Sequence, residues 1–102
     1  MNENPPKELI IALIREDLVH QRLLSGLNNL GLHADDYSLN LSELIFSLLG
    51  YEAGNVPDRL YDRYLQLREE QVRLGTDVSL FRTEAKDRAE IIFGGLESAY
   101  VS

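Results

Sequence analysis

Cysteine is absent from this chain of 102 residues. Its absence excludes three kinds of chemistry at once: disulfide frameworks, thiolate zinc sites and cysteine nucleophiles. A chain without disulfides also suits a reducing compartment. With 44% apolar residues, a single domain of this size can build a core without a covalent or metal staple.

Long hydrophobic runs are missing as well. The longest apolar stretch near the start, Leu9 to Ile14, ends at Arg15, and no basic segment precedes it as in a secretory signal. A helix that crosses a bilayer needs roughly 20 apolar residues. We therefore expect a cytoplasmic protein without membrane contact.

Basic residues are scarce. The chain has 10 basic and 17 acidic residues, a net charge of −7, and no Lys or Arg between Arg22 and Arg59. Nucleic-acid binding draws most of its affinity from basic side chains on phosphates, so we expect no nucleic-acid partner. The stretch between Arg22 and Arg59, called the acidic interval below, contains Asp35, Asp36, Glu43, Glu52 and Asp58. It is either a solvated acidic loop or a docking patch for a basic partner.

Apolar residues recur with the period of a helix, and no segment shows the alternation typical of a strand. The sequence predicts an all-α fold, a four-helix orthogonal array or irregular bundle in one domain over residues 1–102, with a flexible N-terminus at 1–5. The four helices are expected at residues 6–30, 41–49, 57–74 and 79–100. Adjacent Gly94 and Gly95 have low helix propensity, and the sequence leaves open whether the last helix continues through them, kinks or ends there.

Two segments carry more apolar surface than contact with one neighbouring element can bury. The stretch Leu9 to Ile14 is apolar all round, and the short second helix is apolar on nearly every side. We expect the second helix to lie at the centre of the fold or at an interface. The interface candidates are Ile10, Ile11, Ile14, Leu44 and Phe46.

Polar residues interrupt one apolar arc of the first helix. At about 100° per residue, Glu16 and His20 fall in the arc formed by Leu9, Leu13, Leu23 and Leu27. They lie four residues apart and can pair. Three interpretations remain open: a structural polar pair, a pH-sensitive interface, or a metal or acid/base site. A metal needs three or four ligands, and nothing in the sequence brings His33, Asp35 and Asp36 to this helix.

Arg68 interrupts the apolar face of the third helix, angularly between Tyr61 and Tyr64. A guanidinium there can stack on a tyrosine ring and bind a carboxylate. We hypothesise that Arg68 reaches Glu16 with Tyr64 nearby. The alternative is that Arg68 extends along the edge of the face into solvent.

No catalytic or cofactor motif is present. The serines have no nucleophile-elbow context, and the glycines form no phosphate loop. The sequence therefore favours a non-enzymatic helical interaction or assembly protein, a homodimer or the partner of another protein, without a cofactor or metal. The alternative is a metal- or small-ligand-binding protein that uses Glu16 and His20, with Arg68 and Tyr64 as further binding candidates.

Overall fold

The computed structural model describes residues 6–31, 41–52, 54–74 and 78–101, with side chains at 78–80 and 99–101 left aside. Four helices make up this part of the chain, and it contains no strand, so the predicted all-α class is confirmed. Their bounds are α1 Lys7–Asn29, α2 Ser42–Leu48, α3 Asp58–Arg73 and α4 Val78–Val101. Each helix begins and ends within two residues of the bounds predicted from the sequence.

A glycine with a positive φ angle follows the last turn of α1 and of α2. Gly31 follows α1 with φ 81° and Gly50 follows α2 with φ 102°. A positive φ is costly for residues with a Cβ atom, and glycine therefore commonly follows the last turn of a helix. These two positions fix where α1 and α2 stop.

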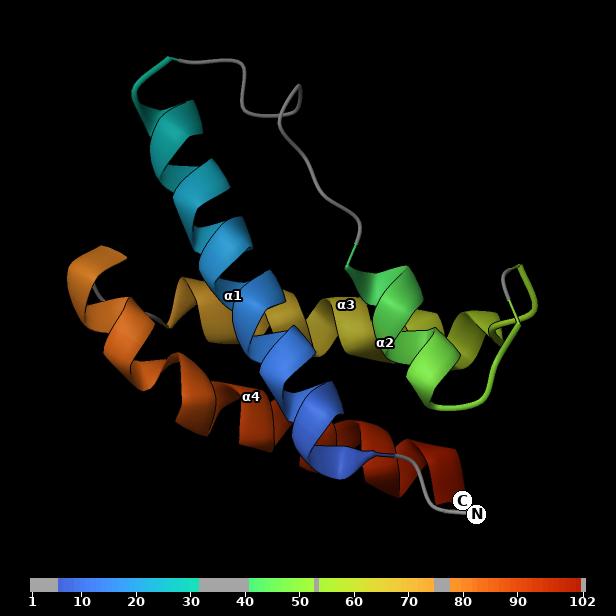
Figure 1. Cartoon of the computed structure of the whole chain (residues 1–102). Coiled ribbons are helices and arrows are strands. Elements are labelled where there is room, and N and C mark those ends of the chain that lie inside the picture. The colour runs from blue at the N-terminus through green and yellow to red at the C-terminus, as the bar shows by residue number, and fades with distance from the viewer. Residues whose placement is uncertain (1–5, 32–40, 53, 75–77, 102) are drawn as a thin grey trace.

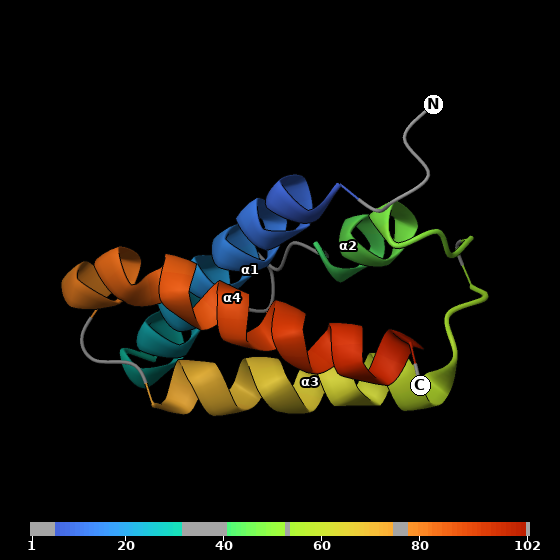
Figure 2. The ribbon, with the colours of Figure 1, turned by 90° about the horizontal axis from the view of Figure 1, so that it is seen from below.

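The arrangement centres on α1 rather than on α2. Helices α3 and α4 run side by side in opposite directions, and α1 crosses them obliquely (Figures 1 and 2). Helix α1 contacts all three other helices, whereas α2 lies beside its first half. The expectation of a central second helix was wrong, because seven residues provide too little surface to be surrounded by three longer helices.

The core lies where these helices meet. From α1 it takes Ile10, Ile14 and Leu18, all fully buried. Ala85 and Ala89 of α4 are equally buried, and such small side chains let two helices approach closely. Further core residues of α2, α3 and α4 are Ile45, Phe46, Leu60, Tyr64, Leu67, Ile92 and Leu96.

Helix α4 continues through Gly94 and Gly95, in agreement with the predicted range 79–100. The two glycines differ in their surroundings. A Cβ atom on Gly95 would lie 2.8 Å from Cδ1 of the buried Leu67, whereas one on Gly94 would meet nothing within 4 Å. Gly95 thus permits the close approach of α4 to α3.

Substitution by alanine should separate these two roles. Gly94→Ala is expected to raise the free energy of unfolding by about 0.5–1 kcal/mol, the gain in helix propensity. Gly95→Ala gains the same propensity but forces Leu67 to move, so it should be at least about 1 kcal/mol less stable than Gly94→Ala. Urea unfolding followed by circular dichroism measures both. Equal stability of the two variants would contradict the close packing at Gly95.

No helix in the described part of the chain combines the length and hydropathy that a membrane crossing requires.

Candidate functional site

The apolar arc of α1 that the sequence singled out faces outward. Leu9 is 50% exposed, the Glu16 side chain is 58% exposed, and His20 is only partly buried. The buried face lies about 100° further round the helix, where Ile10 and Ile14 are fully buried. Helix α1 carries two apolar arcs, and periodicity alone does not say which of them meets the core.

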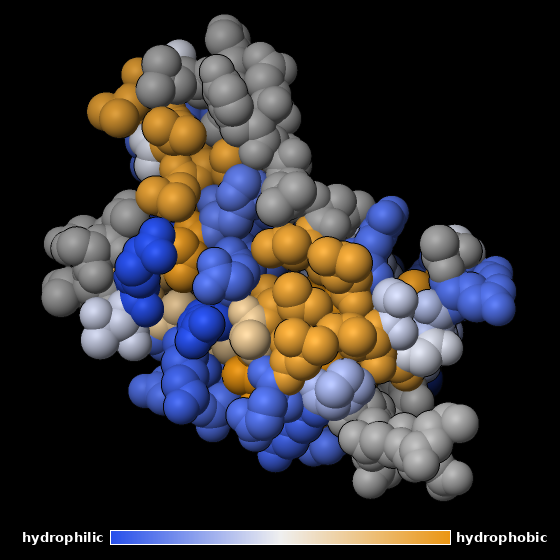
Figure 3. Space-filling model, in the orientation of Figure 1, coloured by the Kyte–Doolittle hydropathy of each residue, from blue (hydrophilic) through white to orange (hydrophobic). Residues whose placement is uncertain are grey.

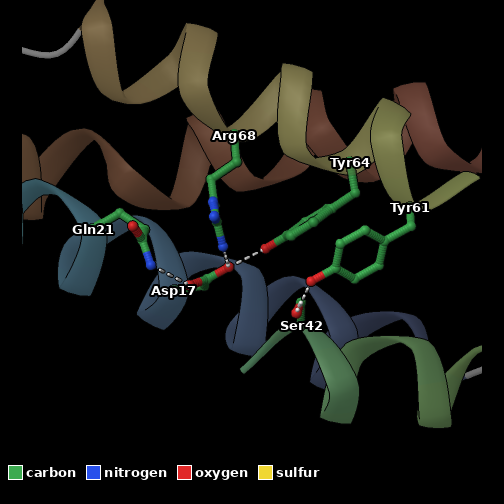
Figure 4. A network of polar contacts seen from close by, with 6 residues as sticks. All are labelled: Asp17, Gln21, Ser42, Tyr61, Tyr64 and Arg68. Carbon is green, nitrogen blue, oxygen red and sulfur yellow. Dashed lines mark hydrogen bonds and ion pairs between the residues drawn. The ribbon is translucent and has the colours of Figure 1, made fainter. Parts of the chain in front are cut away.

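Asp17 is the charged residue on the buried face, and it is fully buried. Its Oδ2 accepts a hydrogen bond from the hydroxyl of Tyr64 and one from Nη1 of Arg68 at 3.1 Å (Figure 4). Its Oδ1 accepts a longer bond from Nε2 of Gln21 at 3.5 Å. The carboxylate from α1 is therefore neutralised and bonded by two side chains of α3, which meets the requirement that a buried charge be paired.

The Tyr64 hydroxyl is held in its protonated form. Burial first, and then the adjacent Asp17 carboxylate, raise its pKa well above the ordinary value for tyrosine, against a smaller opposing effect of Arg68. The phenol is therefore a stable donor to Asp17. The Arg68 guanidinium also lies 5.8 Å from the centre of the Tyr64 ring.

The structure brings Arg68 and Tyr64 together, but the carboxylate they bind is Asp17 and not Glu16. Glu16 points away from this cluster and pairs with Arg15 at 3.6 Å. Asp17 shares its arc with Ile14 and Ile10, three and seven residues earlier, so its position on that second apolar arc was the signal in the sequence. The prediction of Glu16 was wrong because the arc that carries Glu16 faces outward.

Helix α2 is attached to the same region through aromatic rings and one polar contact. The Phe46 ring centre lies 5.7 Å from that of Tyr61 and 5.8 Å from that of Tyr64. The Ser42 Oγ and Tyr61 hydroxyl are hydrogen bonded at 3.3 Å (Figure 4). The Asp17 cluster and the Phe46 contacts together join α1, α2 and α3.

The interface candidates from the sequence differ in exposure, because four are buried and one is exposed. Ile10 and Ile14 are fully buried, Ile11 is 8% exposed and Phe46 is 1% exposed. These four side chains belong to the chain's own core and offer no surface to a partner. Leu44, at 53% exposure, is the member of the set that a partner can reach.

A cleft of about 670 Å³ lies between the second half of α1 and α3. Arg22, Arg68 and Arg73 line it, together with a single carboxylate from Glu69. This concentration of positive charge contrasts with the net charge of −7. Arg68 is already paired with Asp17, so the buried carboxylate offsets part of this positive charge.

A smaller hollow of about 260 Å³ opens beside α2. Three carboxylates of the acidic interval, from Glu43, Glu52 and Asp58, surround aromatic side chains that include Phe46 and Tyr61. The other two acidic residues, Asp35 and Asp36, lie outside the described residues, as does His33. Over the described ranges, no group of three or more His, Cys, Asp and Glu side chains is placed to hold a metal ion.

Comparison with protein-family models, with curated proteins and with solved structures finds no match to this chain.

Proposed function

We propose that the protein is a helical interaction protein that associates with a second copy of itself through the outward face of α1. This outward face consists of Leu9, Leu13, Glu16, His20, Leu23, Leu27 and Leu30. The observation that carries the proposal is the exposure of three of its five leucines, because Leu9 is 50%, Leu23 38% and Leu30 77% exposed.

An aligned leucine face on a surface helix is unusual for a chain that remains alone. Single exposed apolar residues are common on monomers, but contiguous apolar surface typically marks a protein interface. Figure 3 shows hydrophobic surface over the first half of α1 and α2, and again over the second half of α1. A partner that covers the outward face removes this surface from water.

The buried cluster of Asp17, Tyr64 and Arg68 is better suited to holding the helices together than to chemical reaction. Asp17 and Tyr64 are fully buried and bonded to each other, so neither presents a reactive atom to solvent. Of the outward face, the internal packing uses Leu13 in part and leaves Leu9, Leu23 and Leu30 exposed.

Self-association should depend on the outward face of α1 and not on exposed apolar residues of α4. Leu23→Glu puts a charge at its centre, and burying that charge at two symmetric places should weaken the dimer at least about tenfold. Ile91→Glu is the matched control, because Ile91 is 56% exposed but belongs to α4. Sedimentation equilibrium from low to high micromolar concentration should show a monomer–dimer equilibrium for the wild type and for Ile91→Glu.

Two results would contradict the proposal. One is a wild-type protein that stays monomeric at high micromolar concentration. The other is a Leu23→Glu variant that dimerises as strongly as the wild type while its circular dichroism shows an intact fold.

A further inference from the structure

The outward face of α1 repeats with the spacing of a coiled coil. Its residues follow one another in alternating steps of four and three, from Leu9 through Leu13 and Glu16 to Leu30. Such a repeat keeps one seam of side chains facing a partner helix along its whole length. Five of the seven positions are leucine, and the two that are not, Glu16 and His20, lie next to each other in the series.

This pattern is complementary to itself when one helix is reversed. Set antiparallel about a two-fold axis that passes between Glu16 and His20, Glu16 of one helix faces His20 of the other. The same placement sets Leu13 opposite Leu23 and Leu9 opposite Leu27. All six residues then meet a partner of their own kind, polar with polar and leucine with leucine, as a two-fold symmetric interface requires.

We propose that two copies of the chain pair through α1 in this antiparallel register, with two symmetric contacts between Glu16 of one copy and His20 of the partner. The inference rests on the proposed function and adds the orientation and register of the pair. A carboxylate and an imidazole across the interface satisfy each other, so these polar residues select the register while the leucines supply apolar burial.

Other arrangements of the same two helices leave polar groups badly placed. A parallel pair in register sets Glu16 against Glu16, a contact between like charges. An antiparallel pair shifted by one heptad in either direction sets Glu16 against a leucine, so the partner helix offers the carboxylate no polar group. The register proposed above is the one that avoids both costs.

The position of α1 in the fold leaves this face accessible. Ile10, Ile14 and Asp17, about 100° further round the helix, hold α1 in the core. On the outward face itself Leu9, Glu16, Leu23 and Leu30 are exposed, whereas Leu13, His20 and Leu27 are partly buried and Leu13 also packs against the core. Hydrophobic surface lies over both halves of α1, with hydrophilic surface between them (Figure 3). The exposed Leu44 of α2 adds to the apolar surface beside the first half.

Disulfide cross-linking tests the register directly, because the chain has no cysteine of its own. Leu13→Cys and Leu23→Cys are prepared as separate variants and oxidised mildly, alone and as a mixture. The antiparallel register brings position 13 of one copy to position 23 of the partner, within the separation that a disulfide spans. Two copies of position 13 are then ten residues apart along the helix, about 15 Å.

The expected result is a covalent dimer that contains one chain of each variant, formed at least about tenfold faster in the mixture than in either variant alone. Leu9→Cys with Leu27→Cys should behave in the same way, and this second pair guards against damage to the interface by one substitution. Ile91→Cys measures random collision. Fast cross-linking of Leu13→Cys with itself indicates a parallel pair and overturns the proposal.

Charge exchange tests the two polar contacts. Glu16→Lys and His20→Glu should each weaken self-association, since each sets unfavourable charges at both symmetric places. In a mixture, the new lysine of one variant faces the new glutamate of the other, while the second contact keeps its native pair. Mixed dimers should therefore form more strongly than either homodimer, and a mixture without this preference contradicts the contact between Glu16 and His20.

The outcomes separate the inference from the proposed function. A monomeric wild type removes both. A wild type that dimerises and is disrupted by Leu23→Glu, but cross-links each cysteine variant with itself, retains the function and removes the antiparallel register.

Discussion

Replacing Asp17 with alanine is expected to lower the free energy of unfolding by about 3–5 kcal/mol. The carboxylate is fully buried and accepts bonds from Tyr64 and Arg68, which both come from α3. Its removal leaves the tyrosine hydroxyl without its acceptor and Arg68, whose side chain is 23% exposed, without its counter-charge. Domains of this size have total stabilities of about 5–15 kcal/mol, so the variant should be close to unfolding.

The neighbouring residue provides a matched control. Glu16 is one position away on the same helix, and its exposed pair with Arg15 at 3.6 Å should contribute little. Glu16→Ala is therefore expected to change stability by less than about 0.5 kcal/mol. Asp17→Asn keeps an oxygen that can accept from Tyr64 but removes the charge that faces Arg68, so it should fall between the two. Urea unfolding measures all three, and equal effects of the two alanine variants would refute the buried cluster.

Phe46→Ala is expected to cost about 3–5 kcal/mol and to loosen α2 more than the rest of the chain. The ring is 1% exposed and contacts Tyr51, Tyr61 and Tyr64, with centre separations of 6.4, 5.7 and 5.8 Å. A helix of seven residues has no stability of its own in water and depends on such contacts. Hydrogen exchange should show the largest loss of protection in α2.

Leu44 is the matched control on the same short helix. It is 53% exposed, so Leu44→Ala should change the stability by less than about 0.5 kcal/mol. The sequence offered Phe46 and Leu44 together as interface residues, and this pair of variants measures how differently the fold uses them. Comparable losses of stability in both would mean that Phe46 does not anchor α2.

Most of the fold could be predicted from local sequence signals. The apolar periodicity and the glycines after the first two helices place all four helices within two residues. The core positions Phe81, Ala85, Ala89 and Ile92 of α4 also follow from its period, because a single apolar stripe on a helix has one way to be buried. The proximity of Arg68 and Tyr64 could be predicted in the same way, since residues one turn apart on α3 are neighbours on the helix surface.

The candidate site was predicted only in part. The sequence located a contact of Arg68 and Tyr64 with a carboxylate of α1 and selected Glu16, whereas the structure uses Asp17. The error is one residue in the chain and about 100° around the helix. It arose because Leu9 and Leu13 form as good an apolar arc as Ile10 and Ile14, and each arc contains an acidic residue.

The sequence by itself determined the composition of the helices, where they begin and end, and the pattern of leucines, Glu16 and His20 along one face of α1. These are properties of single helices, set by propensity, by period and by glycine at the ends. Only the tertiary structure decided that this face points outward, that Asp17 is the buried acid and that α2 lies at one side. Those outcomes depend on how whole helices share a common core, and two equally apolar arcs on one helix are distinguished only by what packs against them.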